Sequence, residues 1–577
     1  MNAPLRVAPE ASSRADAALA AERTVNVDTV LAWQHDGEEL AIIDVREEGE
    51  FGVGHLLYAI NAPYSRLELD LLTRIPRLTT RLVLVDNVPG TKGRATQRLA
   101  SLGYTDIYTL EGGIARWQDA GQTLFHGVNV PSKAFAELVE HAFNTPGVDP
   151  ADLAKRQASG ENLVVLDCRT EAEFERYHVP GAINAPGVEL LRTFDDLVDD
   201  PSRTVVVSCA GRTRGIIGAQ ALINAGIPNP VLHLRGGTQA WRLAGFDLES
   251  GASPQVAAVG TATGASGTYA ETPLTGSALE RTKRLIVQFG LEKISHADLA
   301  AWQTDTRRTT FVFDVRTAAE YRKGHLAGSI HAPGGQLVQT TDRWIGTRGA
   351  RVVLIDDLTQ RAALTAHWIK QLGHEVVLLD KPLSQGHLVS GEHAKGSEAH
   401  DANNASDTRP PVTATSASTL ITPADALKAL QEGADGLFFG SSADYLQGHP
   451  PGVRWQTRSR IGSDKNVSSS VEFIVAFGSD EALAHLAAID LAETFPKAKI
   501  AVVRGGIDAW RDAHLPLEAS QNALREEERI DYLFWAHDSH DGNLAAIAQY
   551  LGWEEQLPHQ IGDPSQSGYH LLGSNAH

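Results

Sequence analysis

Cys209 is the residue of this 577-residue chain whose type and setting point most directly to chemistry, and the chain has only one other cysteine. It follows the apolar run 205–207 and opens a short loop that contains glycine and arginine, after which an apolar helical pattern begins. Loop amides and the amino end of a helix that face a thiol lower its pKa and stabilise negative charge on it. Arg212 and Arg214 are expected to add local positive charge. The pattern predicts that Cys209 is a nucleophile.

Length, charge and composition limit the class of protein. A chain of 577 residues predicts three to five domains. Two cysteines cannot build a disulfide framework, which favours a reducing compartment. We find no signal-peptide pattern in residues 1–23 and no apolar stretch near the roughly 18 residues of a membrane span. The net charge of −20 argues against nucleic acid. We expect a soluble cytoplasmic protein with no nucleic-acid or membrane partner.

One sequence pattern recurs four times. An Asp-x-Arg triplet is followed by an acidic–aromatic pair, a histidine that usually follows glycine, and a segment ending in Ala-Pro. Complete copies begin at Asp44, Asp167 and Asp314, and an eroded fourth copy has 438–440 in place of the triplet. A second signature, Gly-Gly-x3-Trp, closes the first, second and fourth copies. The repeats therefore predict four related domains.

The spacing of the copies predicts how they are grouped. Successive copies begin 123, 147 and 124 residues apart, which suggests two tandem pairs joined by a longer linker. Short apolar runs alternate with amphipathic patterns, as expected for α/β domains with a mainly parallel sheet. Helices are expected at 526–535 and 543–551. The predicted divisions are tails at 1–23 and 519–577, domains at 24–126, 130–250, 277–383 and 419–518, and linkers at 251–276 and 384–418.

Together these motifs resemble the rhodanese family of sulfurtransferases, over roughly residues 24–518. The resemblance implies four tandem rhodanese-like domains, each a small mainly parallel sheet flanked by helices, with a cysteine loop between a strand and a helix. The six-residue loop 209–214 is similar to that of sulfur-transferring members. Phosphatase relatives have a loop one residue longer, so loop length disfavours a phosphatase.

Three of the four domains are expected to be catalytically silent. Cys209 lies 42 residues after Asp167, and the same offset falls on Asp86 in the first domain and Asp356 in the third. The corresponding segment of the fourth domain, 477–480, contains no cysteine. A carboxylate cannot accept sulfane sulfur as a thiolate does, and it would repel an anionic substrate.

The resemblance implies a double displacement on Cys209. Its thiolate would take the outer sulfur of thiosulfate or a similar small anionic donor, and a thiol, cyanide or protein-thiol acceptor would then remove the sulfur from the persulfide. Arg214, together with Arg212, is expected to bind the sulfonate, and no metal or organic cofactor is expected. The residues expected to bind the donor and the persulfide are Ala210, Gly211, Arg212, Thr213, Arg214 and Gly215.

Other recurring residues are interpreted as supports. Asp167 and Arg169 are expected to form a structural pair near a strand end. His178 and Trp241 have counterparts in silent domains, which also indicates structural roles. Cys168 has two interpretations: a small buried residue, or a thiol near Cys209 that resolves the persulfide into a disulfide.

Alternatives stay open at this point. The donor could be 3-mercaptopyruvate or glutathione persulfide. The chain could also be a sulfur carrier or protein-binding scaffold with mostly silent domains. A homo-oligomer is possible, and the sequence does not identify the physiological donor or acceptor.

Overall fold

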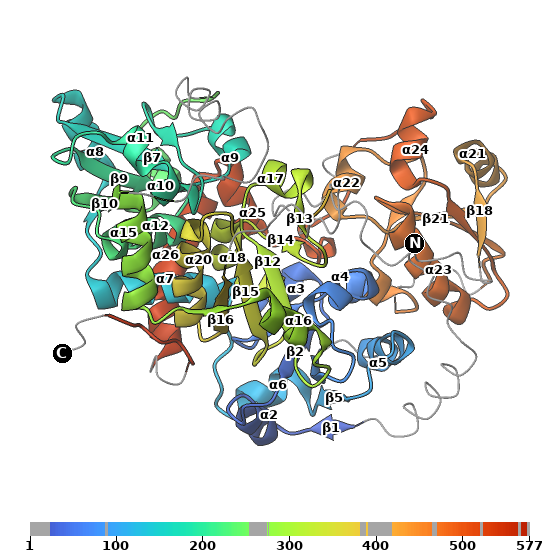
Figure 1. Cartoon of the computed structure of the whole chain (residues 1–577). Coiled ribbons are helices and arrows are strands. Elements are labelled where there is room, and N and C mark those ends of the chain that lie inside the picture. Colours follow the sequence, from blue (N-terminus) through green and yellow to red (C-terminus); the bar gives the residue numbers. More distant parts are fainter. Residues whose placement is uncertain are drawn as a thin grey trace. The chain divides into compact units, whose positions relative to one another are not determined.

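The protein is described by a computed structural model that covers residues 23–86, 90–252, 274, 276–380, 388–390, 418–463, 470–519, 523–562 and 567–573. These residues form four five-stranded sheets in which every neighbouring pair of strands is parallel, with helices on both sides (Figure 1). The predicted fold class is therefore confirmed. The amino-terminal tail 1–22 and most of both predicted linkers lie outside the described residues, and the exact domain limits stay predictions.

All four sheets have one strand order. Numbered along the chain within each domain, the strands lie in the order first, fifth, fourth, second, third. In the first two domains the strands are β1 (Thr24–Val25), β2 (Leu40–Asp44), β3 (Ala59–Asn61), β4 (Arg81–Val85), β5 (Ile107–Leu110), β6 (Gly147–Val148), β7 (Leu163–Asp167), β8 (Ile183–Asn184), β9 (Thr204–Ser208) and β10 (Val231–Leu234). In the last two they are β11 (Glu292–Ile294), β12 (Thr310–Asp314), β14 (Ile330–His331), β15 (Arg351–Ile355), β16 (Glu375–Leu379), β18 (Thr419–Ile421), β19 (Asp435–Phe438), β20 (Arg454–Trp455), β21 (Phe473–Phe477) and β22 (Lys499–Val503). A separate antiparallel pair joins β13 (His325–Leu326) to β17 (Leu388–Val389).

The inner strands of each sheet are almost entirely buried, because helices cover both faces. In the first domain these helices are α2 (Val27–Trp33), α3 (Glu48–Val53), η1 (Tyr64–Arg66), α4 (Leu67–Arg74), α5 (Thr91–Ser101) and α6 (Gly113–Asp119). In the second they are α7 (Val130–Phe143), α8 (Pro150–Ala158), α9 (Glu171–Arg176), α10 (Glu189–Arg192), α11 (Phe194–Leu197), α12 (Thr213–Ala225) and α13 (Gly237–Leu243). In the third they are α15 (Gly276–Gln288), α16 (His296–Thr304), α17 (Ala318–Lys323), α18 (Gly334–Gln339), α19 (Thr341–Trp344) and α20 (Gln360–Gln371). In the fourth they are α21 (Pro423–Gln431), α22 (Ser442–Gln447), η3 (Arg458–Arg460), α23 (Glu481–Thr494) and α24 (Gly506–Asp512). No described helix is long and apolar enough to cross a membrane.

The four domains group in space into two compact units, and these units do not follow the tandem pairs along the chain. One unit contains the first and fourth domains, and the other contains the second and third domains with the end of the chain. The spacing of the copies along the chain gives the length of the segments between domains. Which domains pack together depends instead on whether their surfaces are complementary. In the second unit the backbones of Gly187 and Gly335 approach so closely that an added Cβ on either would lie within 3 Å of the other. In the first unit Arg458 donates two hydrogen bonds to Glu68, at 2.7 and 2.8 Å.

The Asp-x-Arg triplets form buried ion pairs at the end of the second strand of their domains. Arg316 donates to both carboxylate oxygens of Asp314, at 2.8 and 2.5 Å, and to the carbonyl of Gly324. Asp44 with Arg46, and Asp167 with Arg169, form the same fork. The repeated histidine stacks on the preceding aromatic ring, as His178 does on Phe174 with centroids 3.8 Å apart. The triplet therefore ties the loop after the strand to the body of the domain, both in the domain that carries Cys209 and in the first and third domains, which have no cysteine.

The end of the chain differs from its prediction in two places. The helix expected at 526–535 is replaced by the short turn η4 (Glu526–Glu528), followed by α25 (Phe534–Asp538) and η5 (Ser539–Asp541). The residues after η4 are irregular because the carbonyl of Ile530 accepts a hydrogen bond from Gly49 and Leu533 packs on Gly52. The helix expected at 543–551 exists and runs further, as α26 (Leu544–Ile561).

The buried fork gives a prediction with an internal control. Arg316→Ala removes the partner of Asp314, which is fully buried, so the free energy of unfolding should fall by about 3–5 kcal/mol. Arg307 forms the same i, i+2 pair with Asp305 but its side chain is 88% exposed, so Arg307→Ala should leave the unfolding midpoint unchanged. Urea unfolding followed by tryptophan fluorescence compares the two variants. Equal midpoints would show that the triplet does not stabilise the fold.

Candidate functional site

Cys209 lies directly after β9, near the middle of the second sheet. The chain turns over four residues and enters α12 at Thr213, so the last two residues of the six-residue loop belong to the first helical turn. The amide of Gly215 donates to the Cys209 sulfur at 3.2 Å, and the thiol contacts the carbonyl of Gly211 at 3.3 Å. The side chain is 1% exposed. The predicted strand–loop–helix setting is thus present, with the amino end of α12 at the sulfur.

The pKa of Cys209 lies below the ordinary value of a cysteine thiol. The main cause is a hydrogen bond with Cys168, and the charge of Arg214 and the amide of Gly215 act in the same direction. Burial and the carboxylate of Glu554 oppose this shift. A thiol with a lowered pKa holds more of the reactive thiolate at neutral pH.

The position of Cys168 fits both interpretations of its role, because the residue is buried and also adjacent to Cys209. It follows β7, the strand that pairs with β9, and its sulfur lies 3.1 Å from the carbonyl oxygen of Ser208. Its pKa is raised, first by the hydrogen bond with Cys209 and then by burial. Both cysteines are free thiols. Resolution of a persulfide by Cys168 stays a prediction.

Both loop arginines already have carboxylate partners. Arg214 donates two hydrogen bonds of 2.7 Å to Glu173, which lies on α9. Arg212 turns towards α7, where it donates to both oxygens of Glu137 at 2.8 and 2.7 Å and to Glu140 at 2.5 Å. A donor sulfonate would have to share these groups, so the expected binding roles of the two arginines stay predictions.

The Gly-Gly-x3-Trp signature anchors the backbone of the cysteine loop through hydrogen bonds. The amides of Thr238 and Gln239, at the start of α13, donate to the carbonyls of Cys209 and Ala210 at 2.8 and 2.9 Å. Gly237 has a φ of +55°, and a Cβ there would lie 2.2 Å from the Cys209 carbonyl oxygen, so no larger residue fits. Because α13 holds the loop carbonyls on one side of the loop, the loop amides can face the Cys209 sulfur on the other side. The signature is structural, which explains its presence in silent domains.

The carboxy-terminal helix α26 supplies site residues that the sequence reading missed. Glu554 accepts the amide of Arg212 at 3.2 Å, the hydroxyl of Thr213 at 3.1 Å and the ammonium of Lys133 at 3.0 Å. The ring of Tyr550 and the Glu554 carboxylate both lie beside Gly211, about 3 Å from where its Cβ would be. The helix packs on α7 and α13 (Figure 1). The only hint in the sequence is a pair of glutamates within a mostly apolar helix.

The groups around the loop carry more negative than positive charge, although the charge of Arg214 still lowers the pKa of Cys209. Counting the groups that contact the loop or its arginines, with histidine neutral, gives five carboxylates against three cations. Burial raises the pKa of Glu137 to about 7, so the excess at neutral pH is one to two negative charges. The groups counted are Glu137, Glu140, Glu173, Glu554, Glu555, Lys133, Arg212 and Arg214.

The silent third domain keeps the loop but fills the sulfur position with oxygen. Asp356 follows β15 as Cys209 follows β9, and its carboxylate accepts the amides of Asp357 and Arg361, both at 2.8 Å. The Arg361 guanidinium donates to it as well, at 2.9 Å. In the fourth domain Gly478 takes this place, and α23 begins after a loop that is one residue shorter. In the first domain, residues 87–89 of the loop lie outside the described part.

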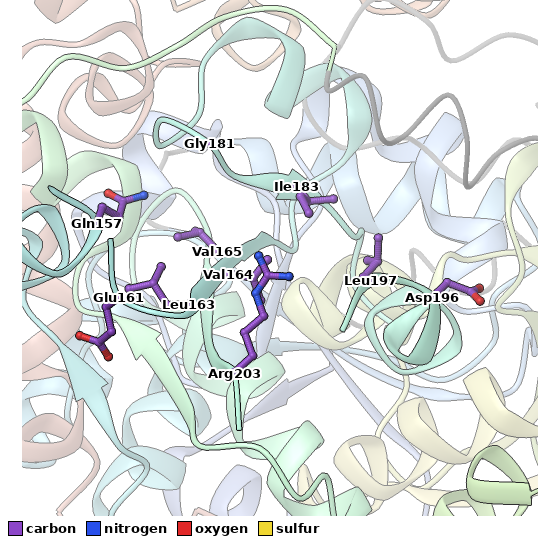
Figure 2. Close-up of a pocket in the computed structure, with 10 residues that line it drawn as sticks. All are labelled: Gln157, Glu161, Leu163, Val164, Val165, Gly181, Ile183, Asp196, Leu197 and Arg203. Carbon is purple, nitrogen blue, oxygen red and sulfur yellow. The ribbon is translucent and has the colours of Figure 1, made fainter. Parts of the chain in front are cut away.

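Two cavities of the second domain are lined by residues outside the cysteine loop. Figure 2 shows one of about 440 Å³ at the starting edge of the sheet, opposite the edge that carries the cysteine. Its lining residues are Gln157, Glu161, Leu163, Val164, Val165, Gly181, Ile183, Asp196, Leu197 and Arg203. A second cavity, of about 520 Å³, lies beside Tyr177 and Arg242. Within the described residues, no group of three or more His, Cys, Asp or Glu side chains could hold a metal ion.

Comparison with known proteins defines the class. The model of the rhodanese-like domain matches residues 26–120, 149–244 and 295–385. The chain is also 30% identical over 101 residues to a sulfurtransferase of Allochromatium vinosum, covering 18% of this chain and 92% of that protein. The chain therefore belongs to the rhodanese family.

Two further similarities bear on the whole chain and on its substrate. A crystal structure of a thiosulfate sulfurtransferase from Pseudomonas aeruginosa aligns with 95% of this chain and 100% of its own, with 37% identity and a TM-score of 0.83. A 3-mercaptopyruvate sulfurtransferase of Escherichia coli (strain K12) is 29% identical over 171 residues, 24% of this chain and 57% of that protein. The chain spans about half the length of the first curated relatives that it matches.

The contact between the cysteines predicts a shift in reactivity. Cys168→Ala removes the hydrogen bond that does most to lower the pKa of Cys209, so the pKa of Cys209 should rise. The rate of Cys209 alkylation by iodoacetamide should then fall at neutral pH and recover only at higher pH. Cys168→Ser keeps a hydrogen-bond donor, so its rate of Cys209 alkylation should stay closer to that of the unmodified protein. Superimposable pH profiles for all three proteins would contradict this account of the thiolate.

Proposed function

We propose that this protein is a rhodanese-type sulfurtransferase that moves sulfane sulfur through a persulfide on Cys209. The observation that supports this most is the Cys209 thiol, which has a lowered pKa and accepts the Gly215 amide at the start of α12. The same setting would stabilise the terminal sulfur of a persulfide, which is also anionic.

The proposed reaction has two displacements. The Cys209 thiolate attacks the outer sulfur of thiosulfate, the bond between the two donor sulfur atoms breaks, and sulfite leaves with the electron pair. An acceptor nucleophile then attacks the outer sulfur of the persulfide, and the Cys209 thiolate departs. In the first step one sulfur–sulfur bond breaks and another forms. In the second step the sulfur–sulfur bond of the persulfide breaks and a bond to the acceptor forms, so no external oxidant or reductant is required.

Thiosulfate is the first donor to test, because the Pseudomonas aeruginosa protein that aligns with almost the whole chain is titled a thiosulfate sulfurtransferase. The Escherichia coli relative keeps 3-mercaptopyruvate as an alternative, and glutathione persulfide is a third. Cyanide, a small thiol or a protein thiol would serve as acceptor.

A second role is favoured by the silent loops. Asp356 and Gly478 stand where a nucleophile would be, yet their domains keep the full sheet and pack in pairs. We propose that the third domain acts as a packing or docking partner of the second, which carries Cys209, and that the fourth domain does so for the first. Sulfur transfer by the whole chain would then depend on Cys209 alone.

Transfer of sulfur from thiosulfate to cyanide tests the proposal. Cys209→Ala should lower the rate by about a thousandfold or more, because the covalent route is lost. Cys168→Ala should keep turnover, with its optimum displaced to higher pH. Mass spectrometry of the protein after thiosulfate treatment should find one added sulfur atom on Cys209. Turnover that survives in Cys209→Ala, or a protein that takes up no sulfur from any of the three donors, would refute the proposal.

A further inference from the structure

The carboxylate of Glu554 stands where the cysteine loop would receive an anion. Loop amides next to a helix amino end bind phosphate, sulfonate and carboxylate groups. Here the amide of Arg212 donates to one Glu554 oxygen at 3.2 Å, and the hydroxyl of Thr213 donates to the other at 3.1 Å. The side chain comes from α26, more than three hundred residues further along the chain.

The position of Glu554 is held firmly. Its side chain is 1% exposed, and Lys133 of α7 and the hydroxyl of Tyr550 both donate to it, at 3.0 and 3.1 Å. The same carboxylate opposes ionisation of Cys209. A buried carboxylate with these partners is costly to displace, because its charge would lose four hydrogen bonds.

Within the part of the chain that the structure describes, the cations that contact the loop or Glu554 are already paired with carboxylates. Lys133 is engaged by Glu554, Arg214 by Glu173, and Arg212 by carboxylates of α7. A donor with two negative charges would therefore compete with Glu554 for the Arg212 amide in a region that already carries excess negative charge.

We propose that Glu554 is a specificity-determining residue that weakens the binding of dianionic sulfonate donors and favours donors whose group beside the transferable sulfur is neutral or cationic. The inference rests on the proposed function and deepens it. Amine-bearing persulfides should therefore be the better class of donor, and thiosulfate should act as a donor only at high concentration.

The test compares two glutamates that are neighbours on α26. Glu554→Gln removes the charge at the loop, whereas Glu555→Gln removes a charge whose side chain is 57% exposed and lies 3.1 Å from Arg212. Thiosulfate, a dianion, and cysteamine persulfide, which bears an ammonium group, serve as donors in each protein. Steady-state rates with cyanide as acceptor give KM and kcat separately.

Glu554→Gln should lower the KM for thiosulfate by about tenfold or more, since a charge within about 4 Å is poorly screened in a buried site. It should raise the KM for cysteamine persulfide several-fold. Glu555→Gln should change either value by less than about threefold, because solvent and salt screen an exposed charge. Should loss of the Lys133 partner prevent folding of Glu554→Gln, Glu554→Asp keeps the charge but withdraws it from the Arg212 amide, and it should lower the thiosulfate KM several-fold.

The inference is overturned if Glu554→Gln leaves the thiosulfate KM unchanged, matches Glu555→Gln, or reduces kcat equally for both donors. A binding measurement separates this failure from failure of the proposed function. Sulfite should protect Cys209 from iodoacetamide at about tenfold lower concentration in Glu554→Gln than in the unmodified protein. If that protection is seen while no donor loads sulfur on Cys209, the proposed function falls and the role of Glu554 stands. Equal protection in both proteins overturns the inference.

Discussion

Backbone amides that face a negatively charged partner organise the loop after the fourth strand in the second and third domains. In the second domain that partner is the sulfur of Cys209, and in the third it is the carboxylate of Asp356. The carbonyls of the active loop point the other way and are held by the start of α13. In the second domain the glycine there admits no Cβ, so this loop relies on the glycine of its Gly-Gly-x3-Trp signature. Loss of the nucleophile in the third domain therefore did not require loss of the loop.

The third domain contributes to the fold although it has no cysteine, because its loop takes part in the contact with the second domain. Arg361, which holds Asp356, also donates to Glu189 of the second domain at 2.9 Å. The silent loop is thus part of the surface that joins the two domains of its unit. Charged groups around the Cys209 loop are likewise paired, and the pKa of Cys209 is lowered mainly by Cys168, then by the charge of Arg214 and the amide of Gly215.

Much of the fold could be predicted because it depends on local patterns. Apolar runs, the Asp-x-Arg triplet and the cysteine loop each lie within one domain, so the sheet class, the four copies and the position of Cys209 follow from short segments. The pairing of domains could not be predicted in this way. It depends on whether distant surfaces fit, as Gly187 and Gly335 do, and spacing along the chain does not report that.

By itself, the sequence determined the nucleophile, its loop and the repeated supports, since these are residues close in sequence whose geometry follows from one strand, one turn and one helix. Only the tertiary structure decided that Cys168 touches Cys209, that both loop arginines are paired, and that Glu554 reaches the loop from α26. The physical reason is that charge and hydrogen bonding at a buried site depend on every group within a few ångströms. At Cys209 those groups come from four segments spread over more than four hundred residues.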